Sequence, residues 1–166
     1  ITMIYEGTNG IQAMDLLGRK LGMNKGKPFM DLFGEMQTTI ARAKDIPILE
    51  KAATKVEEVV NKLAEVAIHM GTTAMGPKVL AAFANAHPFQ DATGDTVFAW
   101  MLLWRAVTAA QNLEKAKKKD IPFYQGVIKS LEFYAQTVLP ITLGRFAALL
   151  NTSAVAVEIE DDMFPS

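Results

Sequence analysis

The stretch from Leu49 to Met70 restricts the fold more than any other part of this sequence. Its apolar residues recur every three or four positions, and lysines and glutamates fill the gaps. That period places apolar side chains on one face of an α-helix, whereas a half-buried strand would need strict alternation. The spacing therefore predicts one long helix over residues 48–75, with this inward face: Leu49, Ala52, Ala53, Val56, Val59, Val60, Leu63, Val66, Ala67 and Met70.

Helical periodicity also dominates the rest of the chain, and strand signals are nearly absent. The sequence predicts helices from Thr8 or Asn9 to Gly22 and over residues 28–44, 91–118 and 124–150, with a short helix ending at Phe83. Punctuation between helices comes from the turn sequence MNKGKP, from Asp45-Ile46-Pro47 and from His87-Pro88, and Pro140 is expected to bend the last helix. Two further apolar stripes are predicted: Ile11, Met14, Leu17 and Leu21, and Phe29, Leu32, Phe33, Met36 and Ile40.

The whole pattern predicts an all-α fold, an up-and-down bundle of about four long helices plus short helices. The chain has 166 residues, of which 50% are apolar, enough for one domain with a sizeable core. Its longest predicted helices exceed the usual length, which suits packing between two subunits. The segment Val97–Trp104 is apolar all round, and such a helix needs cover on nearly every side. We therefore expect a homo-oligomer, most simply a dimer.

Several classes of function are excluded by composition. The net charge of −1 gives no electrostatic case for nucleic acid, and the absence of cysteine removes disulfides and thiolate chemistry. No run of apolar residues is long enough to predict a membrane span. His69 and His87 lack partners at metal-ligand spacing, so no metal site is expected. The acidic tail, VEIEDDMFPS, is expected to be loosely held or docked through Phe164.

The turn Glu6-Gly7-Thr8 stands before the first predicted helix and allows two interpretations. A carboxylate before a helix N-terminus is favoured by the helix dipole, glycine permits the turn, and threonine is a good N-cap. Alternatively, Gly7 lets a ligand approach the backbone and Glu6 points at it as a base, while the helix N-terminus faces an anion. Local physics alone favours the first interpretation.

The longer string YEGTNGIQAMDLLGRKL resembles the catalytic-glutamate segment of acyl-CoA dehydrogenases. In that family a Tyr-Glu-Gly-Thr turn leads into a late helix of the C-terminal helical domain, and Ile-Gln follows; here these are Tyr5 to Thr8, Ile11 and Gln12. The Leu-Gly-Arg-Lys run at 17–20 is similar to the subfamily with an extra C-terminal extension. Phe123-Tyr124 and Val138-Leu139-Pro140 are similar to its last helices.

The resemblance implies a function for the first turn. Such enzymes oxidise an acyl-CoA thioester to the trans-2-enoyl-CoA, with FAD as cofactor and an electron-transfer flavoprotein or other acceptor as partner. Glu6 would be the catalytic base, and its own N–H would help to stabilise the enolate-like charge. Gly7 would border the substrate, and Thr8, Asn9 and Gly10 would face the cofactor.

The resemblance also implies a division of the chain. Residues 1–22 would end the catalytic helical domain, and residues 23–166 would form the C-terminal extension, of structural or oligomeric use. We expect the chain to be a C-terminal piece of a longer, cytoplasmic enzyme. By itself this piece should be inactive and should not bind FAD tightly. The alternatives are a non-catalytic helical dimerisation module and a free-standing helical scaffold, which has no need of the opening motif.

Two other groups of residues leave their function open. The run EKAKKKD, residues 114–120, suits either CoA phosphates or a solvated helix C-terminus, where lysine is favoured by the dipole. Phe98, Trp100, Trp104 and Arg105 suit either a ligand pocket or packing in a core or interface. In both cases the second interpretation is favoured.

Overall fold

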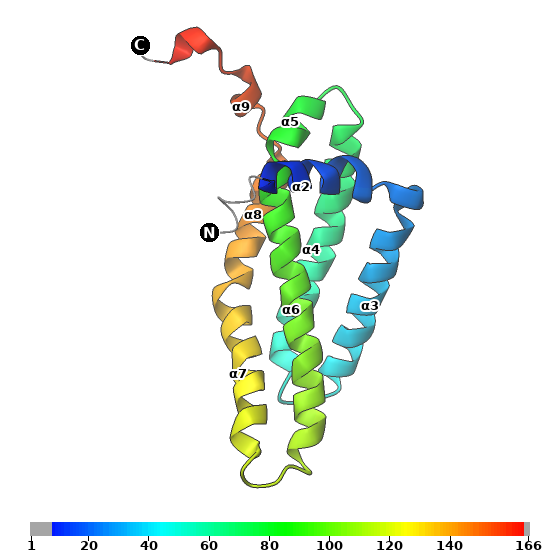
Figure 1. Ribbon diagram of the computed structural model, residues 1–166, viewed down its shortest axis with the longest axis vertical. Coiled ribbons are helices and arrows are strands. Elements are labelled where there is room, and N and C mark those ends of the chain that lie inside the picture. The colour runs from blue at the N-terminus through cyan, green and yellow to red at the C-terminus, as the bar shows by residue number, and fades with distance from the viewer. Residues whose placement is uncertain (1–7, 165–166) are drawn as a thin grey trace.

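The protein is a helical bundle in a computed structural model that describes residues 8–164 (Figure 1). Helices and helical turns follow one another along the chain, and no strand occurs between residues 8 and 164. The predicted all-α class is therefore confirmed. The elements are α2 (Asn9–Asp15), η1 (Leu16–Lys20), η2 (Met23–Gly26), α3 (Lys27–Lys44), α4 (Glu50–Ala74), α5 (Val79–Ala84), α6 (Ala86–Leu113), α7 (Ile121–Thr137), α8 (Leu139–Asn151), α9 (Val155–Glu158) and η3 (Asp161–Met163).

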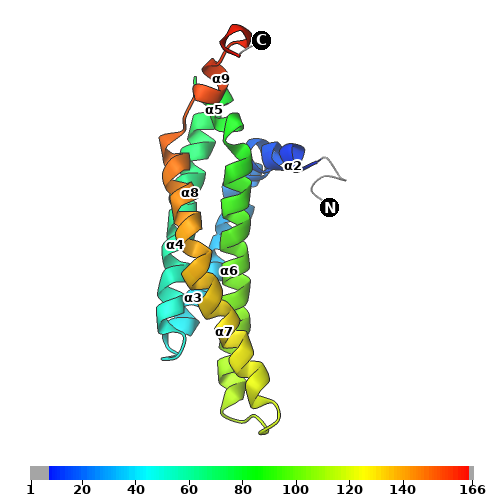
Figure 2. The same ribbon diagram turned by 90° about the vertical axis from the view of Figure 1, so that its left-hand side faces the viewer.

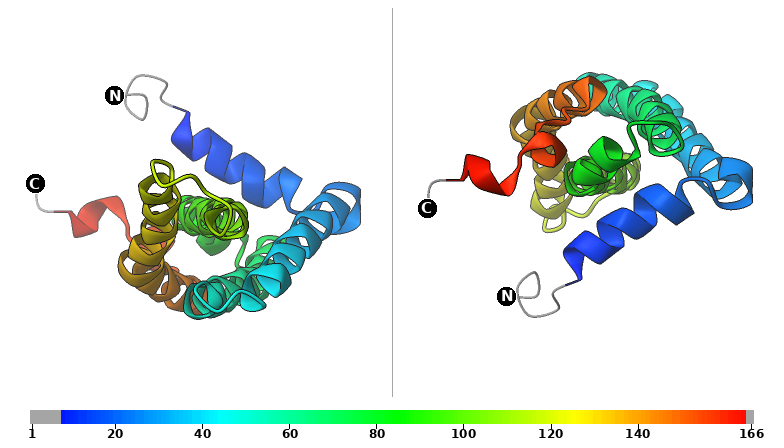
Figure 3. Two further views of the ribbon diagram at one scale, coloured as in Figure 1. Left: turned by 90° about the horizontal axis from the view of Figure 1, so that it is seen from below. Right: turned by 90° about the horizontal axis from the view of Figure 1, so that it is seen from above.

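Four columns run up and down the bundle: α3, α4, α6 and the pair α7–α8 (Figures 1 and 2). Helix α6 packs against all the other columns and also against α2. Seen along the bundle axis, α2 lies across one end of the bundle. The short C-terminal helices extend from the bundle on another side (Figure 3). The segment from Val155 to Phe164 is called the acidic arm below.

The inward face of α4 is as the sequence predicts. All ten predicted residues are buried, and Val56, Val59 and Val60 are wholly inaccessible. They meet α3, α6 and α8, so α4 has neighbours along its whole length. The predicted stripe on α3 is also confirmed, because Met36 and Ile40 are buried and the other three residues pack against the core.

The predicted stripe on the first helix is wrong at two of its four positions. Ile11 is 60% exposed and Met14 is 43% exposed, while Ala13 and Leu17 are buried. The reason is geometric: α2 crosses α6 near its beginning instead of lying along the bundle, so only a narrow strip makes contact. A π-helical turn at Leu16–Lys20, closed by the bond from Leu21 N–H to the Leu16 carbonyl at 2.9 Å, changes the helical phase further.

Two proline predictions also need correction. His87-Pro88 does not stop a helix, because α6 already begins at Ala86 and Pro88 lies in its first turn, where a missing N–H costs little. Pro140 does more than bend a helix: α7 ends at Thr137 and α8 begins at Leu139, with Pro140 in its first turn. The fifth predicted helix is therefore two helices.

The surroundings of two apolar segments differ from expectation. Val97–Trp104 is not covered all round, since Phe98 is 53% exposed and Trp104 is 46% exposed. Phe164 does not dock on the bundle either, because it is 59% exposed: α9 packs against α5, and the rest of the acidic arm extends beyond the helices (Figure 2). Both segments keep apolar surface that this chain's own helices leave open.

One stretch, Ile121–Asn151, is long and apolar enough by length and composition to cross a membrane. It comprises α7 and α8, which are separated by the break at Val138, and one side of it is buried in the bundle core through Ile128, Leu131, Ala135, Leu139, Phe146 and Leu149. A core helix passes the same test, so a single such stretch is weak evidence for a membrane span.

Candidate functional site

The start of α2 is the part of the predicted site that the structure describes. Thr8 is the N-cap residue, and its carbonyl accepts the bond from Gln12 N–H at 2.8 Å. The Thr8 side chain makes no capping hydrogen bond, so its predicted capping role is wrong. Glu6 and Gly7, the predicted base and substrate contact, lie outside the described residues.

The N-terminal end of α2 is accessible. Thr8 and Asn9 are half-buried and Gly10 is exposed. A Cβ atom built on Gly10 would meet no atom within 4 Å, so the bundle itself places nothing against this residue. The first N–H groups of any helix lack intrahelical acceptors, so they are available to a ligand or to water.

The rest of the opening motif holds α2 and η1 in place. Leu17 is buried, and Gly18 makes room for the Phe83 ring, whose Cζ lies 3.1 Å from where a Cβ of residue 18 would stand. Arg19 Nε donates to Asp15 Oδ1 at 2.6 Å, and this hydrogen bond lowers the pKa of the Asp15 carboxyl. Within the motif after Thr8, Ala13, Leu17 and Gly18 therefore have a packing role.

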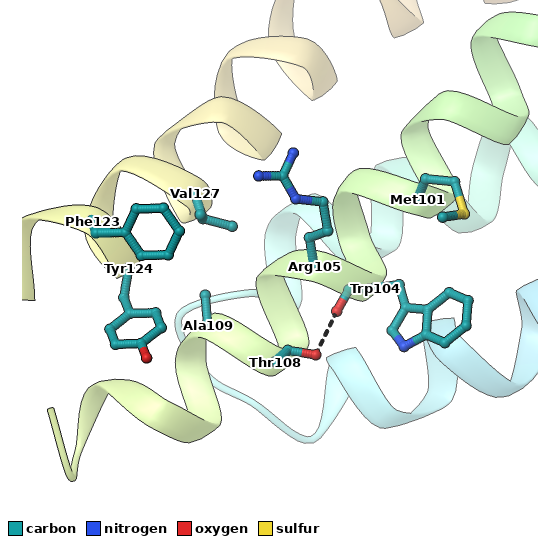
Figure 4. Close-up of a pocket in the computed structure, with 8 residues that line it drawn as sticks. All are labelled: Met101, Trp104, Arg105, Thr108, Ala109, Phe123, Tyr124 and Val127. Atoms are coloured by element: carbon teal, nitrogen blue, oxygen red, sulfur yellow. Dashed lines mark hydrogen bonds between the residues drawn. The ribbon is translucent and has the colours of Figure 1, made fainter. Parts of the chain in front are cut away.

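A groove between α6 and α7 contains two adjoining hollows, of which Figure 4 shows the one next to the turn between these helices. One hollow, of about 370 Å³, is lined by Met101, Trp104, Arg105, Thr108, Ala109, Phe123, Tyr124 and Val127. The other, of about 550 Å³, is lined by Phe98, Leu102, Arg105, Gly126, Lys129, Ser130, Phe133 and Tyr134. Arg105 belongs to both. We call this surface the aromatic groove.

The structure separates the four residues for which a pocket or a packing role was left open. Phe98, Trp104 and Arg105 line the aromatic groove. Trp100 instead turns toward α3, where its Nε1–H donates to Thr39 Oγ1 at 2.9 Å, and its ring stacks on Trp104 at 5.7 Å between centroids. Trp100 is therefore a packing residue, and the other three form accessible surface.

Asp95 on α6 joins that helix to α7 and α8. Its Oδ2 accepts from Arg145 Nη1 at 2.6 Å and from Thr142 Oγ1 at 2.9 Å, and its backbone carbonyl accepts from the Tyr134 hydroxyl at 3.3 Å. Burial, with the Asp95 charge adding to it, raises the pKa of Tyr134 to about 12. Nothing in the local sequence indicates this network, because the partners lie 39 to 50 residues from Asp95.

Each of the two histidines lies beside one polar partner, and the lysine run lies in a turn. His69 Nε2 lies 2.6 Å from Thr152 Oγ1, and His87 Nδ1 lies 3.6 Å from Asp91 Oδ2. Among residues 8–164 no group of three or more His, Asp or Glu side chains is placed to hold a metal ion. Lys115, Lys117, Lys118 and Lys119 are exposed in the turn between α6 and α7, which we call the lysine turn.

The fold and site define an all-helical bundle domain in which the first described helix, α2, begins just after the sequence Glu6-Gly7-Thr8. The family described as "Acetyl-CoA dehydrogenase C-terminal like" matches residues 32–160. This match covers most of the chain, and the chain therefore belongs to that family of acyl-CoA dehydrogenase C-terminal domains.

Curated relatives are all acyl-CoA dehydrogenases by name. The chain is 28% identical over 170 residues to a butyryl-CoA dehydrogenase of Syntrophomonas wolfei, covering 98% of this chain and 27% of the relative. It is 35% identical over 146 residues to a 3-methylmercaptopropionyl-CoA dehydrogenase of Ruegeria pomeroyi, covering 84% of this chain and 23% of the relative. A broad-specificity linear acyl-CoA dehydrogenase of Mycobacterium tuberculosis is 27% identical over 173 residues, with 98% and 26% covered. The chain thus spans about a quarter of the length of these relatives.

Proposed function

We propose that this chain is the C-terminal part of an FAD-dependent acyl-CoA dehydrogenase that converts acyl-CoA thioesters to trans-2-enoyl-CoA. The observation that carries the proposal is the Tyr5-Glu6-Gly7-Thr8 sequence, which stands immediately before α2 in a chain whose bundle matches the family. The names of the relatives support acyl-CoA as the substrate class.

Glu6 is the proposed base, with Gly7 beside the substrate. A proton on the carbon next to a thioester carbonyl is weakly acidic, so its removal needs both a carboxylate and donors to the carbonyl oxygen. The Glu6 carboxylate takes that proton, and the Glu6 N–H is one of the donors. The packing of Leu17 and Ala13 on the bundle supports this role, because it ties the start of α2 to a rigid core.

The start of α2 fits a phosphate-bearing cofactor. Helix N-terminal N–H groups bind phosphate, and the space beside Gly10 is open. Thr8, Asn9 and Gly10 would hold FAD from this side. When bound, FAD supplies the acceptor for the hydride that leaves the β-carbon, and an electron-transfer flavoprotein or another acceptor would then take the electrons from the enzyme.

The test of the base is Glu6→Gln in the full-length parent enzyme. The amide keeps the shape of the side chain and cannot take the proton. Anaerobic mixing with acyl-CoA should then leave the flavin absorbance unchanged on the time scale at which the unmodified enzyme bleaches. Flavin reduction at the unmodified rate would exclude Glu6 as the base.

The isolated chain should neither oxidise acyl-CoA nor bind FAD tightly. A flavin ring needs walls on both faces, and the start of α2 offers only a few donors to one end of the cofactor. Calorimetric titration of the purified chain with FAD should show no sub-micromolar binding. Such binding would mean that residues 1–166 hold most of the cofactor site.

We further propose that residues 1–22 belong to the catalytic domain of a cytoplasmic parent enzyme and that residues 23–166 form an extension that makes a homodimer. The second candidate function, a helical interaction module without catalysis, is favoured by the exposed apolar side chains of Phe98, Trp104, Phe123 and Phe133. The Glu6→Gln measurement separates the two.

A further inference from the structure

The aromatic groove contains few charges. Along α6 from Thr96 to Leu113 the only charged residue is Arg105, and along α7 there are only Lys129 and Glu132. Lys129 Nζ and Glu132 Oε2 pair with each other at 2.5 Å, whereas Arg105 forms no ion pair with any residue between 8 and 164. Exposed Phe98, Trp104, Phe123 and Phe133 surround this single unpaired cation.

The acidic arm and the lysine turn lie at opposite ends of the molecule (Figure 1). The arm has four carboxylates, Glu158, Glu160, Asp161 and Asp162, and no basic residue. The lysine turn, residues 114–120, has four lysines and two carboxylates. All four lysines and all four arm carboxylates are exposed, and none of them forms an ion pair within the described residues.

The direction of the acidic arm is set by contacts at its base. Thr152 has a left-handed backbone with φ at 42°, an unusual conformation for a β-branched residue. Its hydroxyl donates to the Leu149 carbonyl at 2.7 Å and lies 2.6 Å from His69 Nε2. Asn85 Nδ2 donates to the Ser153 carbonyl at 3.2 Å. Helix α9 also packs against α5. These contacts hold the arm at the end of the bundle opposite its own lysine turn (Figure 1).

We propose that two copies of this chain pair antiparallel through their aromatic grooves, with the acidic arm of each copy at the lysine turn of the other. This arrangement deepens the dimer proposed above and therefore rests on it. In a two-fold pair the same patch of each copy meets its equivalent, so both arm–turn contacts form together. The exposed aromatic residues supply the apolar centre, and the opposite charges at the two ends select the antiparallel orientation.

The orientation can be tested by exchanging charges between copies. One variant reverses the lysine turn, with Lys117→Glu, Lys118→Glu and Lys119→Glu. The other reverses the arm, with Glu160→Lys, Asp161→Lys and Asp162→Lys. All six side chains are exposed, so both variants should fold, and circular dichroism checks this. The matched control reverses three exposed cations on α3 and α4, helices that do not line the groove: Arg42→Glu, Lys51→Glu and Lys55→Glu.

Sedimentation equilibrium measures the outcome. The unmodified chain and the control should have twice the 18.2 kDa mass at micromolar concentration, and added salt should weaken the pair. Each reversed variant alone should dissociate with a Kd raised about tenfold or more, since attraction becomes repulsion at both ends. An equimolar mixture of the two variants should recover the pair, because every arm then meets a turn of opposite charge.

Three results would overturn the proposal. A monomer of unmodified chain would exclude the dimer itself. If the unmodified chain is a dimer but the two reversed variants do not pair when they are mixed, the dimer stands and the antiparallel arm–turn contact is excluded. A mass that grows with concentration beyond two copies would indicate open head-to-tail assembly. None of these results bears on Glu6, which the flavin assay tests separately.

Discussion

The outer surface of α4 differs sharply from that of the α6–α7 pair, although all three helices contribute to one core. Helix α4 has seven charged residues in 25, and its outward side is mostly lysine, glutamate and other polar residues, with one exposed large apolar side chain, Ile68. Helix α7 has two charged residues in 17, and its outward side carries Phe123 and Phe133. A solvated helix face is normally charged, whereas a contiguous apolar surface marks an interaction site. The comparison teaches that burial in this chain's own core cannot explain the sequence of the aromatic face.

The largest expected effect on stability comes from comparing a buried phenylalanine on α8 with an exposed phenylalanine on α7. Phe146 is wholly buried on α8, so Phe146→Ala should lower the free energy of unfolding by about 3–5 kcal/mol. Phe133 is 67% exposed on α7, so Phe133→Ala should change it by less than about 0.5 kcal/mol. Guanidinium unfolding at a concentration where the chain is monomeric measures both.

Equal losses in the two variants would contradict the comparison, because Phe133 would then serve the fold of the single chain. In that case the aromatic groove would be ordinary packing surface.

A smaller effect is expected at high pH from Tyr134, which lies between the core and the aromatic groove. Its folded-state pKa of about 12 is raised above the ordinary 10.0. The unfolded state therefore loses its proton first, and the stabilisation by neutral Tyr134 is complete below pH 10 and disappears as the pH rises toward 12. Urea unfolding over this range should show a steeper loss of stability in the unmodified chain than in Tyr134→Phe.

The Asp95→Asn variant sharpens this test. It should lower the pKa of Tyr134 but leave it above the ordinary value, since burial is the main cause of the shift and remains. Phenolate absorbance follows the titration. A pKa that does not move in Asp95→Asn would show that the Asp95 charge has no influence on the tyrosine.

The smallest effect on the free energy of unfolding is expected at the charged outer surface of α3 and α4. Lys44 of α3 and Glu57 of α4 form an ion pair, but both side chains are about a third exposed. Exposed pairs contribute little and are screened by salt, so Lys44→Ala should lower the free energy of unfolding by less than about 1 kcal/mol. The difference should shrink in high salt. A salt-independent loss above 2 kcal/mol would mean that this pair is structurally as important as a buried contact.

The buried face of a helix was predicted correctly where the helix has neighbours along its whole length, and less well where it has few. Every predicted inward residue of α4 is buried, because a helix surrounded along its length must bury its apolar stripe. The stripe of α2 failed at Ile11 and Met14, because a helix that crosses the bundle contacts it along one narrow strip. Helix boundaries failed at prolines, since a proline tolerated in a first turn looks in sequence like a stop.

The candidate site divides in the same way. The motif Tyr5-Glu6-Gly7-Thr8 is contiguous, so it could be recognised without any structure, and the roles assigned to Glu6 and Gly7 stay predictions. The aromatic groove was visible only as apolar residues with two possible roles. Its exposure depends on where α3 and α7 lie around α6, which no local pattern specifies.

The sequence by itself determined the helical class, the α4 core face, the turn at MNKGKP and the family, because each depends on residues within a few positions of one another. Tertiary structure alone decided the crossing of α2, the Asp95 network and the direction of the acidic arm. These depend on contacts between residues 39 to 83 positions apart, such as Asp95 with Tyr134 and His69 with Thr152. Side chains that far apart in sequence meet only when the whole bundle has packed, and a local period carries no information about such meetings.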